Sequence, residues 1–160
     1  GFTGFAVNGK HVYPDNAPDA DYYWFVVLDL KDLSVVANAV TENASEVPSS
    51  IVPYAGKQGY FLVCLSDRTH AYRAPTGALA KFLFQVGAGR ELRCLEQMIE
   101  QLGTGTVVRF SYCLAATTDD GDLPGMEAMS VNGMSYLNIV FMPIYDSNND
   151  FMGYAPGQLS

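Results

Sequence analysis

The sequence predicts a compact α+β domain, with a mixed or antiparallel sheet, a central helix pair and flanking β-hairpins. Strand-like apolar segments occupy both halves of the chain, two helical patterns lie between them, and 160 residues suit one domain with a sizeable core. No internal repeat or linker divides the chain. We expect an N-terminal hairpin and loop over 1–21, a single domain over 22–145 and a C-terminal arm over 146–160.

The N-terminal segment predicts a hairpin followed by a central strand pair. Asn8-Gly9 stands between short apolar runs and is typical of a type I′ turn, so residues 5–12 are expected to form a hairpin. The run YYWFVVLDL over 22–30 is apolar on both alternating faces, as in a strand covered on two sides. We expect it to pair antiparallel with the strand predicted over 33–40.

The next part of the chain combines irregular structure with one more strand. Residues 41–58 contain Pro, Ser, Asn and Gly, which predict an irregular excursion with a helical turn. GYFLVCLS over 59–66 predicts another buried strand. The polar segment DRTHAYRA over 67–74 then predicts a loop.

Two helices follow. Pro75 fits the first helical position, where its missing N–H costs nothing. Apolar residues then recur at the i, i+3, i+4, i+7 spacing of an amphipathic helix. The first stripe is Leu79, Phe82, Leu83 and Val86, and the second, within a helix over 90–102, is Leu92, Leu95, Ile99 and Leu102. Gly87 and Gly103 fit the positions just past the two helix ends.

The C-terminal third predicts a strand, an acidic loop and a second hairpin. The strand covers 106–116 and the loop 117–125. Asn132-Gly133, between apolar runs, is the strongest hairpin signal in the chain. Residues from Asp146 onward have little pattern and predict an extended arm that docks on a neighbour.

The charge pattern excludes some partners. The net charge is −8, and the nine Lys and Arg are scattered, so the basic surface that nucleic acid requires is absent. No apolar run approaches the ~20 residues of a membrane-spanning helix, so no membrane insertion is expected. Only 16% of residues are charged. Such a composition fits either a subunit of a larger assembly or a protein with a large core, and both interpretations stay open.

The cysteines and histidines do not form an evident catalytic or metal site. Cys64, Cys94 and Cys113 each lie in an apolar segment, which favours buried free thiols over disulfides. His11 and His70 lie on predicted loops, far apart in the sequence. Neither a zinc site nor a Cys–His pair follows from these positions, and we expect no cofactor.

Glycines around the second helix raise the possibility of a phosphate cradle. A dinucleotide fingerprint needs a strand before its glycines, but Gly87 and Gly89 follow a helix, and Leu92 stands where that pattern has glycine. The segment therefore favours a structural corner between two helices. We assign structural roles to Gly87, Gly89, Gly103 and Gly133.

Acidic residues cluster in one loop. Asp119, Asp120, Asp122 and Glu127 do not match the EF-hand spacing, so a solvated turn is favoured over a metal site. A glycosidase built on a carboxylate pair stays open, although nothing in the sequence singles out two carboxylates.

One predicted loop has the chemistry of a sugar-binding site. Asp67, Arg68, Tyr72 and Arg73 combine bidentate hydrogen-bonding groups with an aromatic ring for the apolar face of a sugar. A solvated loop is the alternative interpretation of the same residues.

The order of motifs resembles the interleukin-like EMT inducer domain, also called the GG domain. The resemblance covers about residues 22–130 and is carried by four short segments: Leu28-Asp29, Ser66-Asp67, Val86-Gly87-Ala88 and Pro124-Gly125-Met126-Glu127. It implies a sheet-and-helix domain without enzymatic activity, used for recognition or assembly and often for carbohydrate. Family members include secreted signalling proteins and a component of phage tail fibres. The paired cysteines of the secreted members are missing here.

These observations predict a non-enzymatic structural or recognition domain of a virion, such as a phage, or of another extracellular surface. It is expected to pack against itself or larger structural proteins and to bind glycans. A secreted signalling ligand is the alternative, and a carbohydrate-active enzyme is a third possibility.

Overall fold

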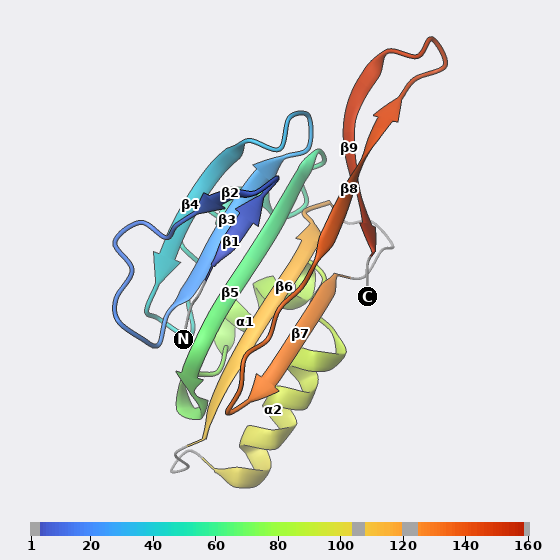
Figure 1. Cartoon of the computed structure of the whole chain (residues 1–160). Helices are drawn as coiled ribbons and strands as arrows, with labels where there is room; N and C mark the ends of the chain where they lie inside the picture. The colour runs from blue at the N-terminus through green and yellow to red at the C-terminus, as the bar shows by residue number, and fades with distance from the viewer. Residues whose placement is uncertain (1–3, 104–107, 120–124, 159–160) are drawn as a thin grey trace.

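A computed structural model describes residues 4–103, 108–119 and 125–158 of the chain. A five-stranded sheet in the order β4-β3-β5-β6-β7, antiparallel throughout, forms its body. The strands are β3 (Tyr23–Asp29), β4 (Val35–Thr41), β5 (Tyr60–His70), β6 (Arg109–Thr117) and β7 (Met126–Val131). Helices α1 (Gly77–Gln85) and α2 (Arg90–Leu102) cover one face (Figure 1). The predicted α+β class is confirmed, with strands dominating.

Two hairpins lie on the sheet face opposite the helices (Figure 1). The first joins β1 (Phe5–Val7) to β2 (Lys10–Val12), and the second joins β8 (Ile139–Tyr145) to β9 (Phe151–Gln158). Asn8 and Gly9 have φ of 51° and 77°, as the predicted type I′ turn requires, so the N-terminal hairpin is confirmed.

The predicted central strand is buried as expected. β3 lies between β4 and β5, and every side chain from Tyr23 to Leu28 is buried. Its antiparallel pairing with β4 is confirmed. The helical turn expected in 41–58 is the 3₁₀ turn Val52–Tyr54.

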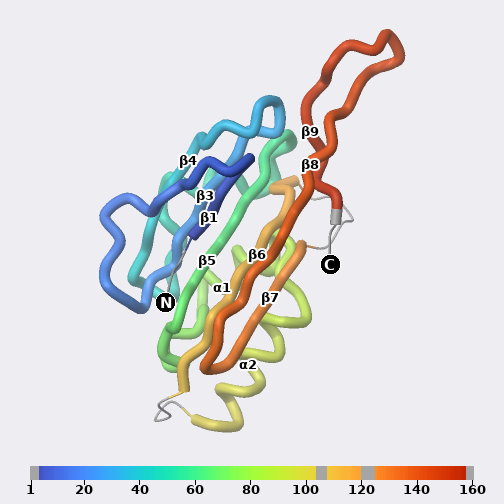
Figure 2. Tube along the Cα trace, viewed as in Figure 1, coloured from blue at the N-terminus to red at the C-terminus, as the bar shows by residue number. Residues whose placement is uncertain are grey.

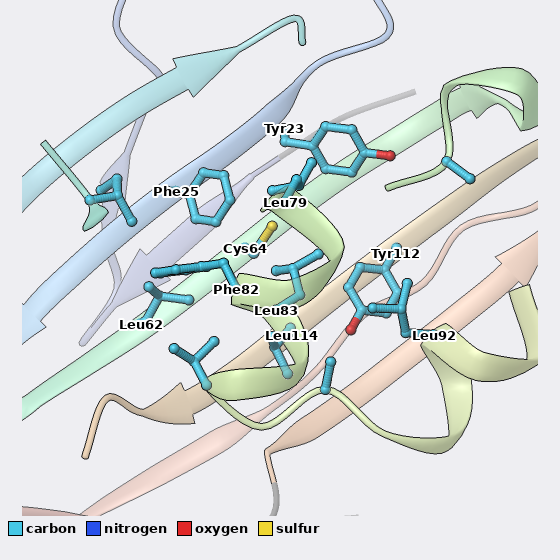
Figure 3. Close-up of a cluster of buried hydrophobic side chains, with 14 of the residues drawn as sticks. Tyr23, Phe25, Leu62, Cys64, Leu79, Phe82, Leu83, Leu92, Tyr112 and Leu114 are labelled. Atoms are coloured by element: carbon cyan, nitrogen blue, oxygen red, sulfur yellow. The ribbon is translucent and has the colours of Figure 1, made fainter. Parts of the chain in front are cut away.

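The helices cover the main core (Figure 3). Alternate strand residues such as Tyr23, Phe25 and Leu62 point toward α1 and α2, because successive side chains of a strand face opposite sides. The Phe25 and Phe82 rings meet edge to face, with centroids 6.1 Å apart. The predicted stripe of α1 is buried, whereas the stripe of α2 is buried only at its start and leaves Leu102 53% exposed.

The opposite face carries a second core. Trp24, Val26 and Leu28 of β3 join Phe61 and Val63 of β5 there, and the two hairpins cover them. Each hairpin contributes an edge-to-face aromatic contact. The centroids of Phe5 and Trp24 lie 6.5 Å apart, and those of Phe61 and Phe141 lie 5.0 Å apart.

The loop predicted over 67–74 is wrong in its first half. β5 continues to His70, because a bulge between Ser66 and Thr69 restores its pairing with β6. Arg68 lies in this bulge with φ of 46°, and the hydroxyls of Ser66 and Thr69 hydrogen-bond to each other. The bulge therefore accommodates polar residues within a strand. His11 likewise lies in a strand, β2, rather than in a loop.

The predicted helix start at Pro75 is also wrong. α1 begins at Gly77, and Thr76 is the extended N-cap residue with φ of −134°. The Thr76 N–H donates to Ala44 O at 2.9 Å. Because the backbone of Thr76 is extended, the first helical residue comes after it and not at the proline.

The hairpin predicted at Asn132-Gly133 does not form. Asn132 turns with φ of 54°, and Ser130 Oγ donates to Met134 O. In the described part of the chain, however, the residues after the turn do not pair with β7. They cross the sheet face and lead into β8, whose Phe141 packs on Phe61. The burial of apolar side chains on this face explains the departure.

The patternless arm predicted from Asp146 is wrong for the residues described, to 158. Phe151–Gln158 is β9, which pairs antiparallel with β8. Asp146 Oδ1 accepts hydrogen bonds from the N–H groups of Asn148 and Asp150 at 2.8 and 2.9 Å. This side chain closes the hairpin turn, a common role of Asp before a tight reversal.

Candidate functional site

A groove of about 600 Å³ lies between the two hairpins. Its floor includes Phe61, Val63 and Leu65 of β5, and its walls are β1 and the segment 135–141. None of the described residues that line it is charged. The groove follows from the topology, because each hairpin covers one side of the sheet face and the two do not meet over its centre.

The C-terminal hairpin extends past the end of the five-stranded sheet (Figure 2). It exposes several large apolar side chains, among them Met142 at 54% and Met152 at 63%. The others are Val140, Ile144, Tyr145 and Phe151. From residue 128 to residue 160, the sequence has no charged residue except Asp146 and Asp150, which flank the turn. An exposed projection with so little charge is unusual for a surface that meets only water.

The middle of this hairpin is fixed to the body. The Tyr154 N–H donates to Leu30 O at 2.7 Å, next to the turn between β3 and β4. Gly153 has φ of 135°, and a Cβ there would lie 2.9 Å from the same oxygen. Any side chain at position 153 would therefore push β9 away from its anchor.

The two faces of β8 differ. Ile139 and Phe141 point to the sheet and are partly buried, whereas Val140, Met142 and Ile144 are exposed. We call these three exposed side chains the outer face of the hairpin. On β9, Ala155 stands opposite Met142 and Gly157 opposite Val140, so the neighbouring strand presents small residues.

Both outer edges of the hairpin carry a proline. Pro143 pairs with Tyr154, whose N–H points outward to Leu30, so this is a non-hydrogen-bonded pair. Pro156 pairs with Phe141 two residues farther along, in a pair of the same kind. The proline nitrogens therefore face outward, and each edge lacks one N–H donor that an added strand would need.

The four residues predicted to bind sugar are divided between two places. Asp67 and Arg68 lie at the β5 bulge, where Arg68 Nε is 3.4 Å from Asp67 Oδ2. Asp67 Oδ1 also accepts a hydrogen bond from Ser111 Oγ at 3.1 Å. Arg68 is 57% exposed, but neither residue lines the hollow that holds the other two.

Tyr72 and Arg73 line an open hollow of about 470 Å³ together with Glu42, Asn43 and Ala44. Both lie in the 3₁₀ turn Ala71–Arg73 that ends β5. The Tyr72 ring is 54% exposed, and the Arg73 guanidinium lies 6.0 Å from its centroid. Arg73 Nη1 also donates to Glu42 O at 2.7 Å, which fixes the guanidinium at the rim.

A histidine and a carboxylate support this hollow from behind. The His70 and Tyr72 rings stack with centroids 5.2 Å apart, and His70 Nδ1 lies 2.9 Å from Asp21 Oδ2. Burial raises the pKa of Asp21, but hydrogen bonds from the backbone and ring of His70 outweigh it and lower this pKa overall. No local pattern in the sequence could indicate this pair, since 49 positions separate its members.

The glycine-rich segment between the helices is a structural corner, as expected. Gly87 has φ of 125°, and its oxygen accepts a hydrogen bond from Gly125 N at 3.0 Å. A Cβ at Gly87 would lie 2.8 Å from that nitrogen. Gly89 is the N-cap residue of α2, and Gly103, with φ of 77°, is its C-cap residue. Gly133 O accepts a hydrogen bond from Ser111 Oγ at 2.8 Å.

The N-terminus of α2 is capped by a side chain from β7. Gly89 has no side chain to cap the helix, and Glu127 does so instead. Its carboxylate accepts hydrogen bonds from the N–H groups of Glu91 and Leu92 at 3.2 and 3.3 Å. The Tyr112 hydroxyl donates to the same group at 2.6 Å. Burial, together with this hydrogen bond, raises the pKa of Tyr112.

Glu127 is thus used inside the fold rather than in the acidic loop. Asp120 and Asp122 of that loop lie outside the described residues. Within the described ranges, no group of His, Cys, Asp and Glu has the arrangement of a metal site.

The thiols differ in exposure. Cys64 and Cys113 are buried, and burial raises the pKa of both. The prediction that Cys94 is buried is wrong, because it lies on an exposed side of α2. Among the described residues, no serine or cysteine side chain hydrogen-bonds to His70, whose ring partner is Asp21.

Comparisons with known proteins assign no family. No protein-family model, curated protein or solved structure matches the chain significantly. The resemblance to the GG domain therefore stays a hypothesis. No helix in the described ranges is long and apolar enough to cross a membrane.

Proposed function

We propose that the chain is a non-enzymatic structural domain that assembles with copies of itself through its C-terminal hairpin. One observation carries the proposal. The part of β8–β9 that extends beyond the sheet exposes large apolar side chains, and its own residues carry no charge apart from the two aspartates of its turn. Association would remove this apolar surface from water, which is the main driving force of protein assembly.

The charge of the molecule favours contact through this element over other surfaces. With a net charge of −8, two copies repel each other wherever their acidic surfaces approach. A projecting, nearly uncharged hairpin lets them touch while the acidic bodies stay apart. The resemblance to the GG domain, which includes a phage tail-fibre component, supports a place in a virion or another surface structure.

The proposal is tested by the mass of the chain in solution. We expect the apparent mass in light scattering to rise with protein concentration. Salt should strengthen the association, because it screens the repulsion between acidic bodies and leaves apolar contact intact. A monomer at every concentration and salt level would refute self-assembly.

Glycan recognition is a second candidate function, favoured by the hollow beside Tyr72. An exposed aromatic ring, a fixed guanidinium and the polar side chains of Glu42 and Asn43 surround it. Sugars are bound by this combination of a ring with hydrogen-bonding groups. Because Asp67 and Arg68 lie outside this hollow, the proposed glycan site contains only Tyr72 and Arg73 of the four predicted residues.

A glycan array with three variants tests this candidate. Tyr72→Ala and Arg73→Ala should each lower binding at least tenfold, whereas Arg68→Ala should leave it unchanged because Arg68 lies outside the hollow. Arg68 is a suitable control, since it is a nearby arginine with an exposed side chain. Absence of binding, or equal effects of all three variants, would refute the site.

A further inference from the structure

We infer that two copies of the chain associate face to face through the outer face of the β8–β9 hairpin, around a two-fold axis, and not by adding strands edge to edge. This inference rests on the proposed self-assembly and specifies its geometry. It concerns Val140, Met142 and Ile144, which are 45%, 54% and 42% exposed.

The edges of the hairpin are unsuited to strand addition. The nitrogens of Pro143 and Pro156 face outward, so each edge lacks a donor where an added strand would need one. The β9 edge is also occupied at Tyr154, whose N–H already donates to Leu30 O. The Gly153 backbone lies against the same oxygen, which leaves no room for another strand there.

The outer face is suited to a copy of itself. Large side chains stand on β8, and the residues opposite them on β9, Ala155 and Gly157, are small. The Met142 side chain already leans over Gly157, since its methyl carbon would lie 3.6 Å from a Cβ at that position. A two-fold axis through the middle of this face would bring the Met142 side chains of the two copies together, each packed over its own Gly157. Methionine adapts well to such a surface.

Charge and area indicate how strong the contact is. The three side chains of the outer face carry no charge, so their burial takes no ion out of water. Asp29 and Lys31 line a hollow with Ile144 and therefore lie at the edge of this face. Three half-exposed side chains and their small neighbours offer only about 300 Å² per copy, against about 800 Å² in a standard interface. We therefore expect a reversible dimer that forms in the high-micromolar range, as suits a contact repeated in a larger assembly.

Charged variants at Met142 test the geometry. Sedimentation of the full chain between about 10 µM and about 1 mM covers the expected range. Met142→Glu should weaken association at least tenfold, because the axis brings the two introduced charges together. Val52→Glu is the matched control: Val52 is 51% exposed, similar to Met142, but lies far from β8 in the sequence, in the 3₁₀ turn.

Mixing opposite charges adds a test that misfolding cannot imitate. Met142→Glu and Met142→Lys should each be monomeric alone and should form a mixed dimer together. If the wild type associates and Met142→Glu associates equally well, the outer face is not the interface, although self-assembly stands. If the two variants are monomeric and do not associate when mixed, the two-fold geometry is wrong. If the wild type never associates, both the inference and the proposed function fail.

Discussion

The cap that Glu127 provides for α2 makes a quantitative prediction about stability. Replacing Glu127 with Ala removes the acceptor for the N–H groups of Glu91 and Leu92. Loss of an N-cap acceptor costs about 1–2 kcal/mol. The Tyr112 hydroxyl, on a residue that is 1% exposed, also loses its acceptor. A buried unpaired hydroxyl costs about 1–3 kcal/mol.

Together these losses predict that Glu127→Ala lowers the free energy of unfolding by about 2–5 kcal/mol. For a chain of this size, that corresponds to a fall in Tm of roughly 10 °C. Glu127→Gln keeps an oxygen acceptor and the side-chain shape but loses the charge that favours the helix N-terminus, so it should cost about 1 kcal/mol. Chemical denaturation followed by far-UV circular dichroism measures both changes.

Two further variants make this prediction refutable. Glu46 is an exposed glutamate, and Glu46→Ala should change stability by less than about 0.5 kcal/mol. Tyr112→Phe removes the hydroxyl donor, so in this background Glu127→Ala should cost less than in the wild type. If Glu127→Ala is as mild as Glu46→Ala, the cap does not stabilise the helix. If the losses of Glu127→Ala and Tyr112→Phe are simply additive, the hydrogen bond between these two residues contributes nothing to stability.

Three other predictions follow from the fold. Gly87→Ala should lower stability by several kcal/mol, because its Cβ would meet Gly125 N at 2.8 Å. A Cβ at Gly133 would meet nothing closer than 3.7 Å, so Gly133→Ala should be nearly neutral, and equal Tm values for the two variants would contradict this. In the folded protein, a thiol reagent should modify Cys94 quickly and the two buried cysteines only on unfolding, and rapid reaction of all three would refute their burial. The pKa of Asp21 is lowered in the folded state, so ionised Asp21 stabilises the fold. This contribution should be complete above the unfolded pKa of about 3.9 and should be lost as the pH falls through the lower pKa of the folded state. Asp21→Asn, which tolerates the same backbone φ of 60°, should therefore be less stable than the wild type at pH 6 and approach it in strong acid; a difference that does not change with pH would contradict the prediction.

The sequence predicted the local structure better than the pairing of distant segments. The helix over 90–102 and the turn at Asn8-Gly9 were correct because periodicity and turn chemistry act over a few residues. Asn132-Gly133 turns the chain in the same way, but the side chains that follow are buried by Phe61, far away in the sequence. Tertiary packing decided where β8 goes, and no local pattern records it.

The candidate sites depended even more on long-range contacts. Tyr72 and Arg73 could be singled out by residue type, but their neighbour Glu42 comes from the end of β4 and was not predicted. Asp67 and Arg68 were grouped with them because they lie close in sequence, and the β5 bulge separates them. The hairpin was missed because β9 contains glycine and proline, which are rare in regular strands.

The single tryptophan of the chain lies where it can report on the N-terminal hairpin. Trp24 is fully buried, its ring meets that of Phe5, and its Nε1–H donates to Asn38 Oδ1 at 2.8 Å. Asn38 in turn donates to Tyr13 O, just after β2. Detachment of this hairpin would admit water to the indole and shift its fluorescence to longer wavelengths, while the helices and their core stayed intact. The emission of one residue thus distinguishes opening of the hairpin face from global unfolding, without any added label.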